Sequence, residues 1–164
     1  MKRAFCIMAA IMIALLSGCA KQKEIVTVPV TEGLNCKFDA TYNGIQLQGN
    51  LKISENMHTV INIQKPDALK GMKLEINGEN MKVAYLGLTT DLKLSDSKQG
   101  AFAGLMVSAL KSAAASVGVD AQQTDEGYVL SGSCEMGDYT LLLDKALHPL
   151  QIKMDSQNFC VNFS

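Results

Sequence analysis

The residues best suited to chemistry are a cysteine and the three residues before it, Leu16-Ser17-Gly18-Cys19. They end an apolar run, Phe5 to Leu16, that follows two basic residues. The run is too short to cross a bilayer core, which takes about 20 apolar residues. A basic start, a short apolar run and small residues at a cleavage site are typical of a signal peptide. We therefore predict a signal peptide over residues 1–18, against two alternatives: an uncleaved anchor, or a cleavage unrelated to Cys19.

The tetrad at residues 16–19 resembles the lipobox of bacterial lipoproteins, with an aliphatic residue and two small residues before the cysteine. The resemblance implies cleavage after Gly18, a diacylglyceryl thioether on Cys19 and an N-acyl chain on the same residue. Two or more acyl chains give stable membrane anchoring. The membrane is thus the expected partner through Cys19, and the expected location is the extracytoplasmic side of the cell membrane or envelope.

The other cysteines of the mature chain are Cys36, Cys134 and Cys160. If Cys19 carries lipid, these three cannot all pair within one chain. No Cys-x-x-Cys or His-x-x-x-His spacing is present, so a zinc site has no support. We expect free thiols, no metal and no cofactor, and the pairing of the three cysteines stays open.

Catalytic patterns are also missing from the sequence. His58 and His148 read as solvated surface groups, and Ser131-Gly132-Ser133 lacks the nucleophile-elbow pattern. No glycine-rich phosphate loop is present. We expect that the protein is not an enzyme.

Charge and length limit which classes of protein the sequence can belong to. After removal of residues 1–18 the acidic side chains slightly outnumber the basic ones, and no basic run occurs. This argues against nucleic acid as a partner. The length after the signal peptide suits a single domain.

Alternation of apolar and polar residues predicts short strands on both sides of one helical segment. Five lie before it, within 34–43, 45–53, 57–64, 72–76 and 81–85, and four lie after it, within 128–134, 139–144, 149–154 and 158–163. Asn43-Gly44 and Asn77-Gly78 are hairpin signals. Ile25–Val28 is a candidate edge strand.

Helical spacing replaces the alternation after Leu94. Three N-cap candidates, Ser95 to Ser97, precede apolar residues at helical intervals from Phe102 to Val117, and Gly118 suits the C-terminal stop. We expect an amphipathic helix. The small residues Gly100, Ala101, Ala103 and Gly104 predict a close approach of this helix to the sheet.

One amphipathic helix and about nine strands with one apolar face predict an α+β fold. A large antiparallel sheet has to curl, and a helix in its concavity gives a half-barrel. The expected organisation is a signal peptide over residues 1–18, a lipid-anchored tether over 19–33 and a half-barrel domain over 34–164.

Two stretches carry a further resemblance: residues 69–78 with 83–88, and the closing pattern Leu143-Asp144-Lys145 followed by Pro149-Leu150-Gln151-Ile152. They resemble the half-barrel lipoproteins of the outer-membrane lipoprotein carrier and receptor family. The resemblance implies an apolar concavity that holds acyl chains, although this chain has no evident helix before its first strand. The ligand-facing residues would be Phe38, Leu47, Ile61, Leu74, Tyr85, Phe102, Leu105, Met106, Ala109, Leu141 and Ile152.

Two functional hypotheses follow from these patterns. In one, the half-barrel binds an acyl chain, lipid or other apolar ligand in the cell envelope. In the other, the helix fills the concavity and the lipoprotein has a structural or protein-interaction role. The ligand, the protein partner, the choice of inner or outer membrane, the strand order and the oligomeric state stay open.

Anchoring is predicted to depend on Cys19, because the sequence offers no second membrane segment. Cys19→Ala should release the protein from the membrane or leave it unprocessed, as measured by membrane fractionation and mass spectrometry. A variant that is processed and still remains on salt-washed membranes would contradict the lipoprotein interpretation.

Overall fold

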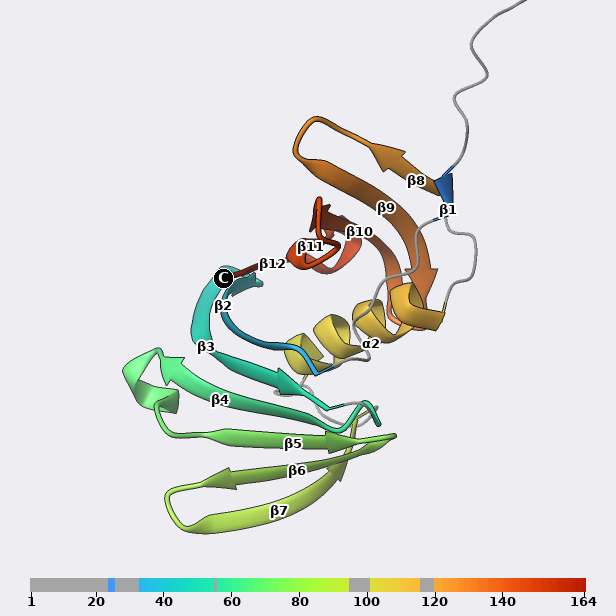
Figure 1. The fold of residues 1–164 in the computed structure, drawn as a ribbon. Coiled ribbons are helices and arrows are strands. Elements are labelled where there is room, and N and C mark those ends of the chain that lie inside the picture. The colour runs from blue at the N-terminus through green and yellow to red at the C-terminus, as the bar shows by residue number, and fades with distance from the viewer. Residues whose placement is uncertain (1–23, 26–32, 55, 95–100, 116–119) are drawn as a thin grey trace, which may run out of the picture.

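Twelve strands and one long helix make up the described part of the chain (Figure 1). This computed structural model describes residues 24–25, 33–54, 56–94, 101–115 and 120–164. The expected signal peptide, Cys19 and most of the tether lie outside the described residues, as do the expected helix caps at 95–97 and Gly118.

The strands fall into two groups, one on each side of the helix. Those before it are β1 (Glu24–Ile25), β2 (Asn35–Tyr42), β3 (Ile45–Ile53), β4 (Thr59–Lys65), β5 (Lys73–Asn77), β6 (Asn80–Tyr85) and β7 (Leu88–Lys93). Those after it are β8 (Asp120–Gln123), β9 (Gly127–Cys134), β10 (Gly137–Asp144), β11 (Pro149–Met154) and β12 (Phe159–Phe163). Two 3-10 turns, η1 (Asp67–Leu69) and η3 (Asp155–Gln157), connect β4 to β5 and β11 to β12.

All twelve strands belong to one sheet in the order β1-β8-β9-β10-β11-β12-β2-β3-β4-β5-β6-β7. Every neighbouring pair is antiparallel. The last strand, β12, pairs with β2 in the middle of the sheet, where Phe163 lies opposite Phe38. The two halves of the chain are therefore joined by backbone hydrogen bonds as well as by their shared core.

Local sequence explains the hairpins and the curl of the sheet. Asn43 and Gly44 have φ angles of 48° and 80°, the left-handed conformation that a two-residue hairpin turn requires. Gly49 lies at a register shift between β3 and β4. A Cβ there would lie 2.2 Å from the carbonyl oxygen of Asn62 and 2.9 Å from the ring of Phe38, so only glycine fits. Such irregularities bend and twist a strand.

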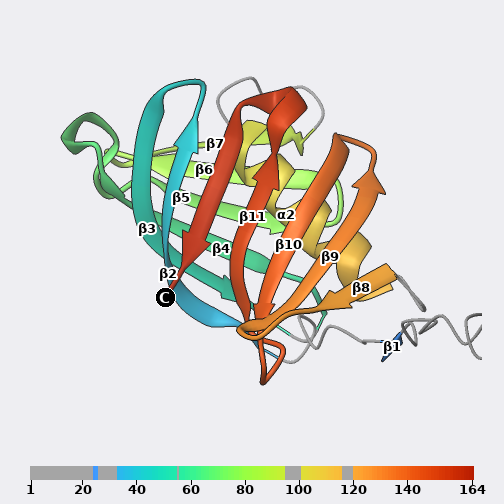
Figure 2. The ribbon, with the colours of Figure 1, turned by 90° about the horizontal axis from the view of Figure 1, so that it is seen from above.

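Helix α2 (Ala101–Ala115) crosses the concave face of this sheet (Figures 1 and 2). It follows β7, at one edge of the sheet, and precedes β8, beside the other edge. Its residues from Phe102 to Val107 are all buried. Within the described residues, no helix is long and apolar enough to cross a membrane.

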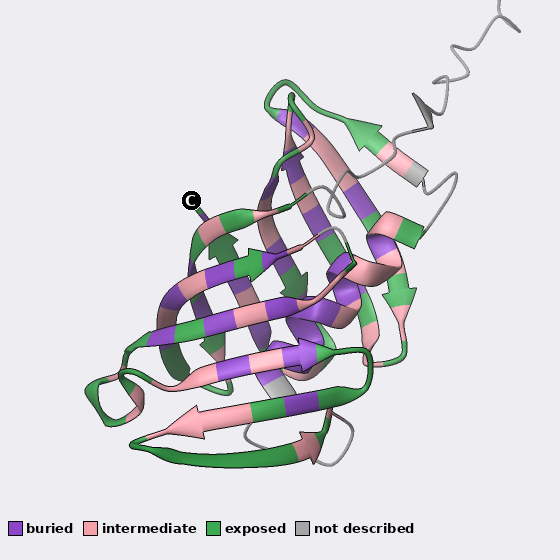
Figure 3. Ribbon diagram, turned by 60° about the horizontal axis from the view of Figure 1, so that its bottom comes forward, coloured by how far each residue is buried: buried purple, intermediate pink, exposed green. Residues whose placement is uncertain are grey.

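The core lies between α2 and the concave face (Figure 3). Inward residues alternate with exposed ones along the central strands; in β3, for example, Leu47, Leu51 and Ile53 are buried while Lys52 is exposed. Phe38 from β2 meets Phe102 from the helix with ring centroids 6.4 Å apart. The outer face of the sheet is polar.

These observations confirm the expected α+β fold, with one helix packed on a large, curved, antiparallel sheet. The strand number differs from the nine expected. The sequence reading omitted β7 and β8, because Leu88–Lys93 is almost wholly exposed and Asp120–Gln123 lacks apolar alternation. As a result α2 follows seven strands, two more than the five expected: β7, which was not predicted, and β1, which was only a candidate. The candidate edge strand near Ile25 appears as the two-residue β1, paired with β8.

Truncation of Leu105 should strongly destabilise the fold. Leu105 is 1% exposed and lies in the core at the helix–sheet contact. Leu105→Ala is expected to cost about 2–5 kcal/mol in the free energy of unfolding, because it removes buried methyl groups and leaves a cavity. Denaturant titration measures this. A loss well under 1 kcal/mol would show that α2 is not packed on the sheet as described.

Candidate functional site

A groove runs along the side of α2 that the sheet leaves uncovered. Its volume is about 680 Å³. Its floor is formed by the helix, and its two walls come from distant parts of the sheet. The lining residues are Gly78, Glu79, Leu94, Gly104, Val107, Ser108, Lys111, Ser112, Ala115, Cys134, Glu135 and Met136.

Hydrogen bonds hold both walls of the groove. On one side, the backbone N–H of Leu94 donates to the carbonyl of Glu79 at 2.8 Å, which ties the end of β7 to the β5–β6 turn. On the other side, Ser112 Oγ donates to the carbonyl of Ser133 at 2.9 Å, which ties α2 to β9. The groove is therefore built on fixed elements rather than on a single loop.

Gly104 forms part of the groove floor. A Cβ at this position would lie 3.5 Å from Leu94 Cγ and 3.8 Å from Met136 Cε, which are ordinary contact distances. An added Cβ would thus already touch Leu94 and Met136, so the helix lies close to these residues at Gly104. Gly100 lies outside the described residues. The missing side chain keeps the groove deep at this point.

The groove combines apolar surface with a few charges. Leu94, Val107 and Met136 are its larger apolar side chains, and Lys111 is its one basic residue, with Glu79 and Glu135 nearby on the walls. Ligand sites are commonly concave, largely apolar and equipped with few polar groups. The chemistry of this lining suits an amphiphile with an apolar tail.

The predicted ligand-facing residues lie beneath the groove. Ten of them are buried in the core: Phe38, Leu47, Ile61, Leu74, Phe102, Leu105, Met106, Ala109, Leu141 and Ile152. Tyr85 is half-buried near the end of β6, and its hydroxyl donates to the carbonyl of Ala68 at 2.5 Å. None of the eleven lines the groove. Contact with a ligand would require α2 to shift, so their ligand-facing role stays a prediction.

The three described cysteines are free thiols. Cys36 and Cys134 pack against the core, whereas Cys160 is not among the residues that do so. Burial raises the pKa of Cys36 to about 11, so its thiol stays protonated at neutral pH and is a poor nucleophile. Cys134, on the groove wall, has its thiol 3.4 Å from the carbonyl of Gly137.

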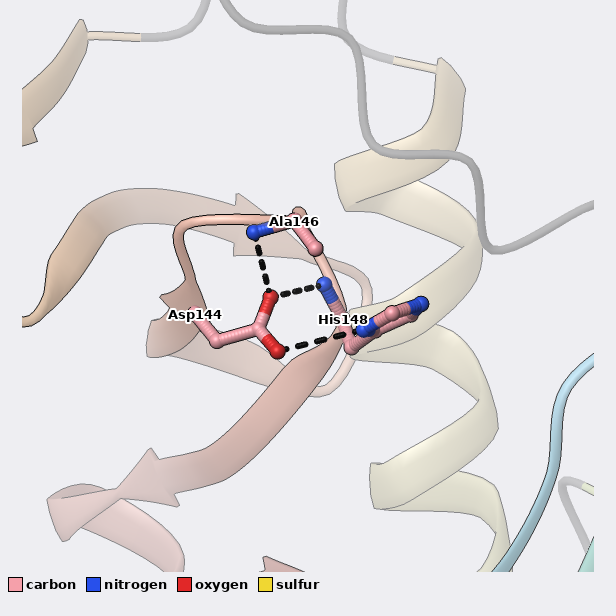
Figure 4. A network of polar contacts seen from close by, with 3 residues as sticks. All are labelled: Asp144, Ala146 and His148. Atoms are coloured by element: carbon pink, nitrogen blue, oxygen red, sulfur yellow. Dashed lines mark hydrogen bonds and ion pairs between the residues drawn. The ribbon is translucent and has the colours of Figure 1, made fainter.

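Away from the groove, a cluster of polar contacts closes the β10–β11 turn (Figure 4). The carboxylate of Asp144 accepts hydrogen bonds from the backbone N–H groups of Ala146 and His148, both at 2.8 Å. Its other oxygen lies 3.1 Å from His148 Nδ1. The ring of His148 is exposed, as the sequence predicts, but its carboxylate partner four residues earlier was missed. The cluster fixes a turn.

Hydrogen bonds lower the pKa of the Asp144 carboxyl, chiefly the one donated by the backbone N–H of His148. Elsewhere, Lys73 lowers the pKa of Glu75, and Asp155 raises the pKa of Lys153, all on the outer surface. In the described part of the chain, no group of three or more histidine, cysteine or acidic side chains could hold a metal ion.

Comparison with known proteins finds likeness in structure alone. No protein-family model matches the sequence, and no curated protein matches it. A conserved protein from Thermus thermophilus is 12% identical, with a TM-score of 0.48 over 84% of this chain and 82% of the other. A LolA superfamily protein from Nitrosomonas europaea is 11% identical, with a TM-score of 0.36 over 80% and 83%. A DUF1329 family protein from Desulfovibrio piger is 11% identical, with a TM-score of 0.39 over 79% and 82%.

The Asp144 cluster predicts an acid-sensitive turn. Because folding lowers the pKa of Asp144, its stabilising effect is complete above the ordinary value of 3.8 and is lost as the pH falls through the lower folded-state pKa. Asp144→Ala should lower the melting temperature at pH 7, and this difference from the wild type should shrink in acid. A difference that is unchanged down to pH 2, or absent at pH 7, would contradict the role of the carboxylate. The measurements cover about pH 2–4 as well as pH 7, because aspartate side chains titrate in that acid range.

Proposed function

We propose that this protein is a lipid-anchored protein of the cell envelope whose half-barrel domain binds an acyl chain of a lipid or lipoprotein. The anchor would be Cys19, which ends the lipobox-like tetrad at residues 16–19. Nothing else in the chain offers a membrane segment by sequence. The domain would then stand on the extracytoplasmic side, close to a supply of acyl chains.

The observation that carries the ligand proposal is the groove along α2. Its volume of about 680 Å³ falls within the range of about 300–1,000 Å³ that is usual for small-molecule sites. Apolar side chains from three separate elements, Leu94, Val107 and Met136, converge on it. An acyl chain laid along the helix would cover this apolar surface, and Lys111 would lie beside an anionic headgroup.

The second candidate is a structural or interaction lipoprotein without a ligand. One observation favours it: α2 already fills the concavity, and ten of the eleven predicted ligand-facing residues are buried by protein contacts. Close-packed cores leave no room for a ligand. In this alternative the groove would be a surface irregularity and the outer face of the sheet would meet a protein.

Substitutions at Gly104 separate these two functions. The test uses the full chain carrying Cys19→Ala, with palmitate as the probe and the melting temperature as readout. Palmitate should raise the melting temperature, since a ligand that binds only the folded state stabilises it. Gly104→Leu should abolish this shift by filling the groove. Gly104→Ala, the matched control, fits at ordinary contact distances and should keep the shift.

Ala109→Phe reports on the space beneath the helix. Ala109 is buried and does not line the groove, so this substitution should destabilise the fold by overpacking, at about 1–3 kcal/mol. If Ala109→Phe folds normally and abolishes the rise in melting temperature with palmitate, while Gly104→Leu does not, the acyl chain binds under α2 among the eleven predicted residues. If neither fatty acid nor phospholipid shifts the melting temperature, the interaction lipoprotein is the better account.

A further inference from the structure

The tip of the β6–β7 hairpin exposes two leucines. Leu86 is 82% exposed and Leu88 is 77% exposed. Leu86 also has a φ of 51°, a left-handed conformation that is uncommon for a bulky side chain. Asparagine or glycine would suit this turn better. An exposed leucine in a strained conformation brings no benefit to the isolated fold, which indicates a role in contact with another surface.

The strand that follows this tip is an open edge. Strand β7 is the last in the sheet order, and five of its six residues are exposed (Figure 3). Natural proteins usually protect edges with proline, bulges, very short strands, inward charges or charged surface side chains such as lysine. β7 includes no proline; its charges, Asp91 and Lys93, lie on the outer face, and its inward positions are Leu88, Thr90 and Leu92. This edge is therefore suited to pairing with another strand.

Backbone geometry identifies which groups are free for pairing. Tyr85 and Leu88 flank the two-residue turn and pair with each other. At the other end of β7, the N–H of Leu94 donates to the carbonyl of Glu79. Leu88 and Leu94 lie an even number of positions apart, so their backbone groups point to the same side of the strand. Residues of even number in β7 thus bond to β6. The N–H and C=O groups of Thr89, Asp91 and Lys93 point away from the sheet at its edge.

We propose that two copies of this chain pair through β7, antiparallel and centred on Thr90. In this register Thr90 faces Thr90 of the partner subunit, and Leu88 faces Leu92 of the partner subunit, twice by symmetry. Leu86 reaches towards Leu94 of the partner subunit. The two copies join their sheets edge to edge and cover the exposed leucines of both, and the contact at Leu94 lies at the wall of the groove.

The sequence of β7 is self-complementary in this register. On the outer face, the hydroxyl of Thr89 lies opposite the carboxylate of Asp91 of the partner subunit, which allows a charge-assisted hydrogen bond. A register centred on Asp91 would place like charges opposite each other, which is destabilising. A register centred on Leu92 would pair Asp91 with Lys93 but leave Leu86 and Leu88 beyond the paired residues.

Disulfide trapping in membranes tests the pairing with the full chain. Thr90 is predicted to form a non-hydrogen-bonded pair, in which Cβ atoms lie about 4.5–5.5 Å apart, close enough for a disulfide after slight adjustment. Thr90→Cys should give a disulfide-linked dimer upon mild oxidation. Thr89→Cys is the matched control, because its partner in the register is Asp91, and the wild type controls for the native cysteines.

A second variant tests the edge without a cross-link. Thr89→Pro removes an N–H that points away from the sheet and keeps every bond to β6, so the fold should retain its melting temperature. Sedimentation should show a dimer for the Cys19→Ala chain and a monomer after Thr89→Pro.

A monomeric Cys19→Ala chain would overturn the proposal, as would cross-linking at Leu92→Cys but not at Thr90→Cys. A third result would also overturn it: the chain is a monomer, it binds phosphatidylglycerol vesicles, and changing Leu86 and Leu88 to serine abolishes that binding. The hairpin tip would then contact the membrane and not a second copy.

Discussion

Burial of the concave face of the sheet against α2 is the contact on which the rest of the structure depends. The helix joins β7 to β8, strands near opposite edges of the sheet, so it must cross the whole concavity. Its residues from Phe102 to Val107 are all buried. Neither partner could stand alone, because the sheet would expose its apolar face and the helix would expose nearly every side chain of its first half.

This contact also determines where a ligand can bind. Among the described residues α2 occupies the concavity, and the groove lies beside the helix, where Gly104 lacks a side chain and the walls come from the β5–β6 and β9–β10 turns. The outer face offers a different surface. Side-chain amides and carboxylates bond across neighbouring strands there, as in Gln48 to Asp39 and Gln151 to Asn162, both at 2.7 Å. In the described part of the chain, a partly apolar groove beside the helix thus contrasts with a polar outer face of the sheet.

Alternation and helical spacing were sufficient to predict the fold class, since both report which side of an element is buried. Phe102, Leu105 and Leu110 fall on the helix side that meets the sheet, as their spacing indicates. Strands β7 and β8 gave no such signal because they lie near the edges, where few side chains are buried. The pairing of β12 with β2 and the groove walls join residues far apart in sequence. They depend on how the sheet curls, which local patterns do not report.

The central claim is that the groove along α2 holds an acyl chain in the cell. Native mass spectrometry of the processed Cys19→Ala chain, purified gently after its release from the membrane, tests it most directly, since any lipid found is then bound without a covalent link. The account predicts a population with the added mass of one acyl lipid, which is released by activation in the gas phase and absent from Gly104→Leu. A single bare protein mass under the mildest conditions, the same for both chains, would contradict it.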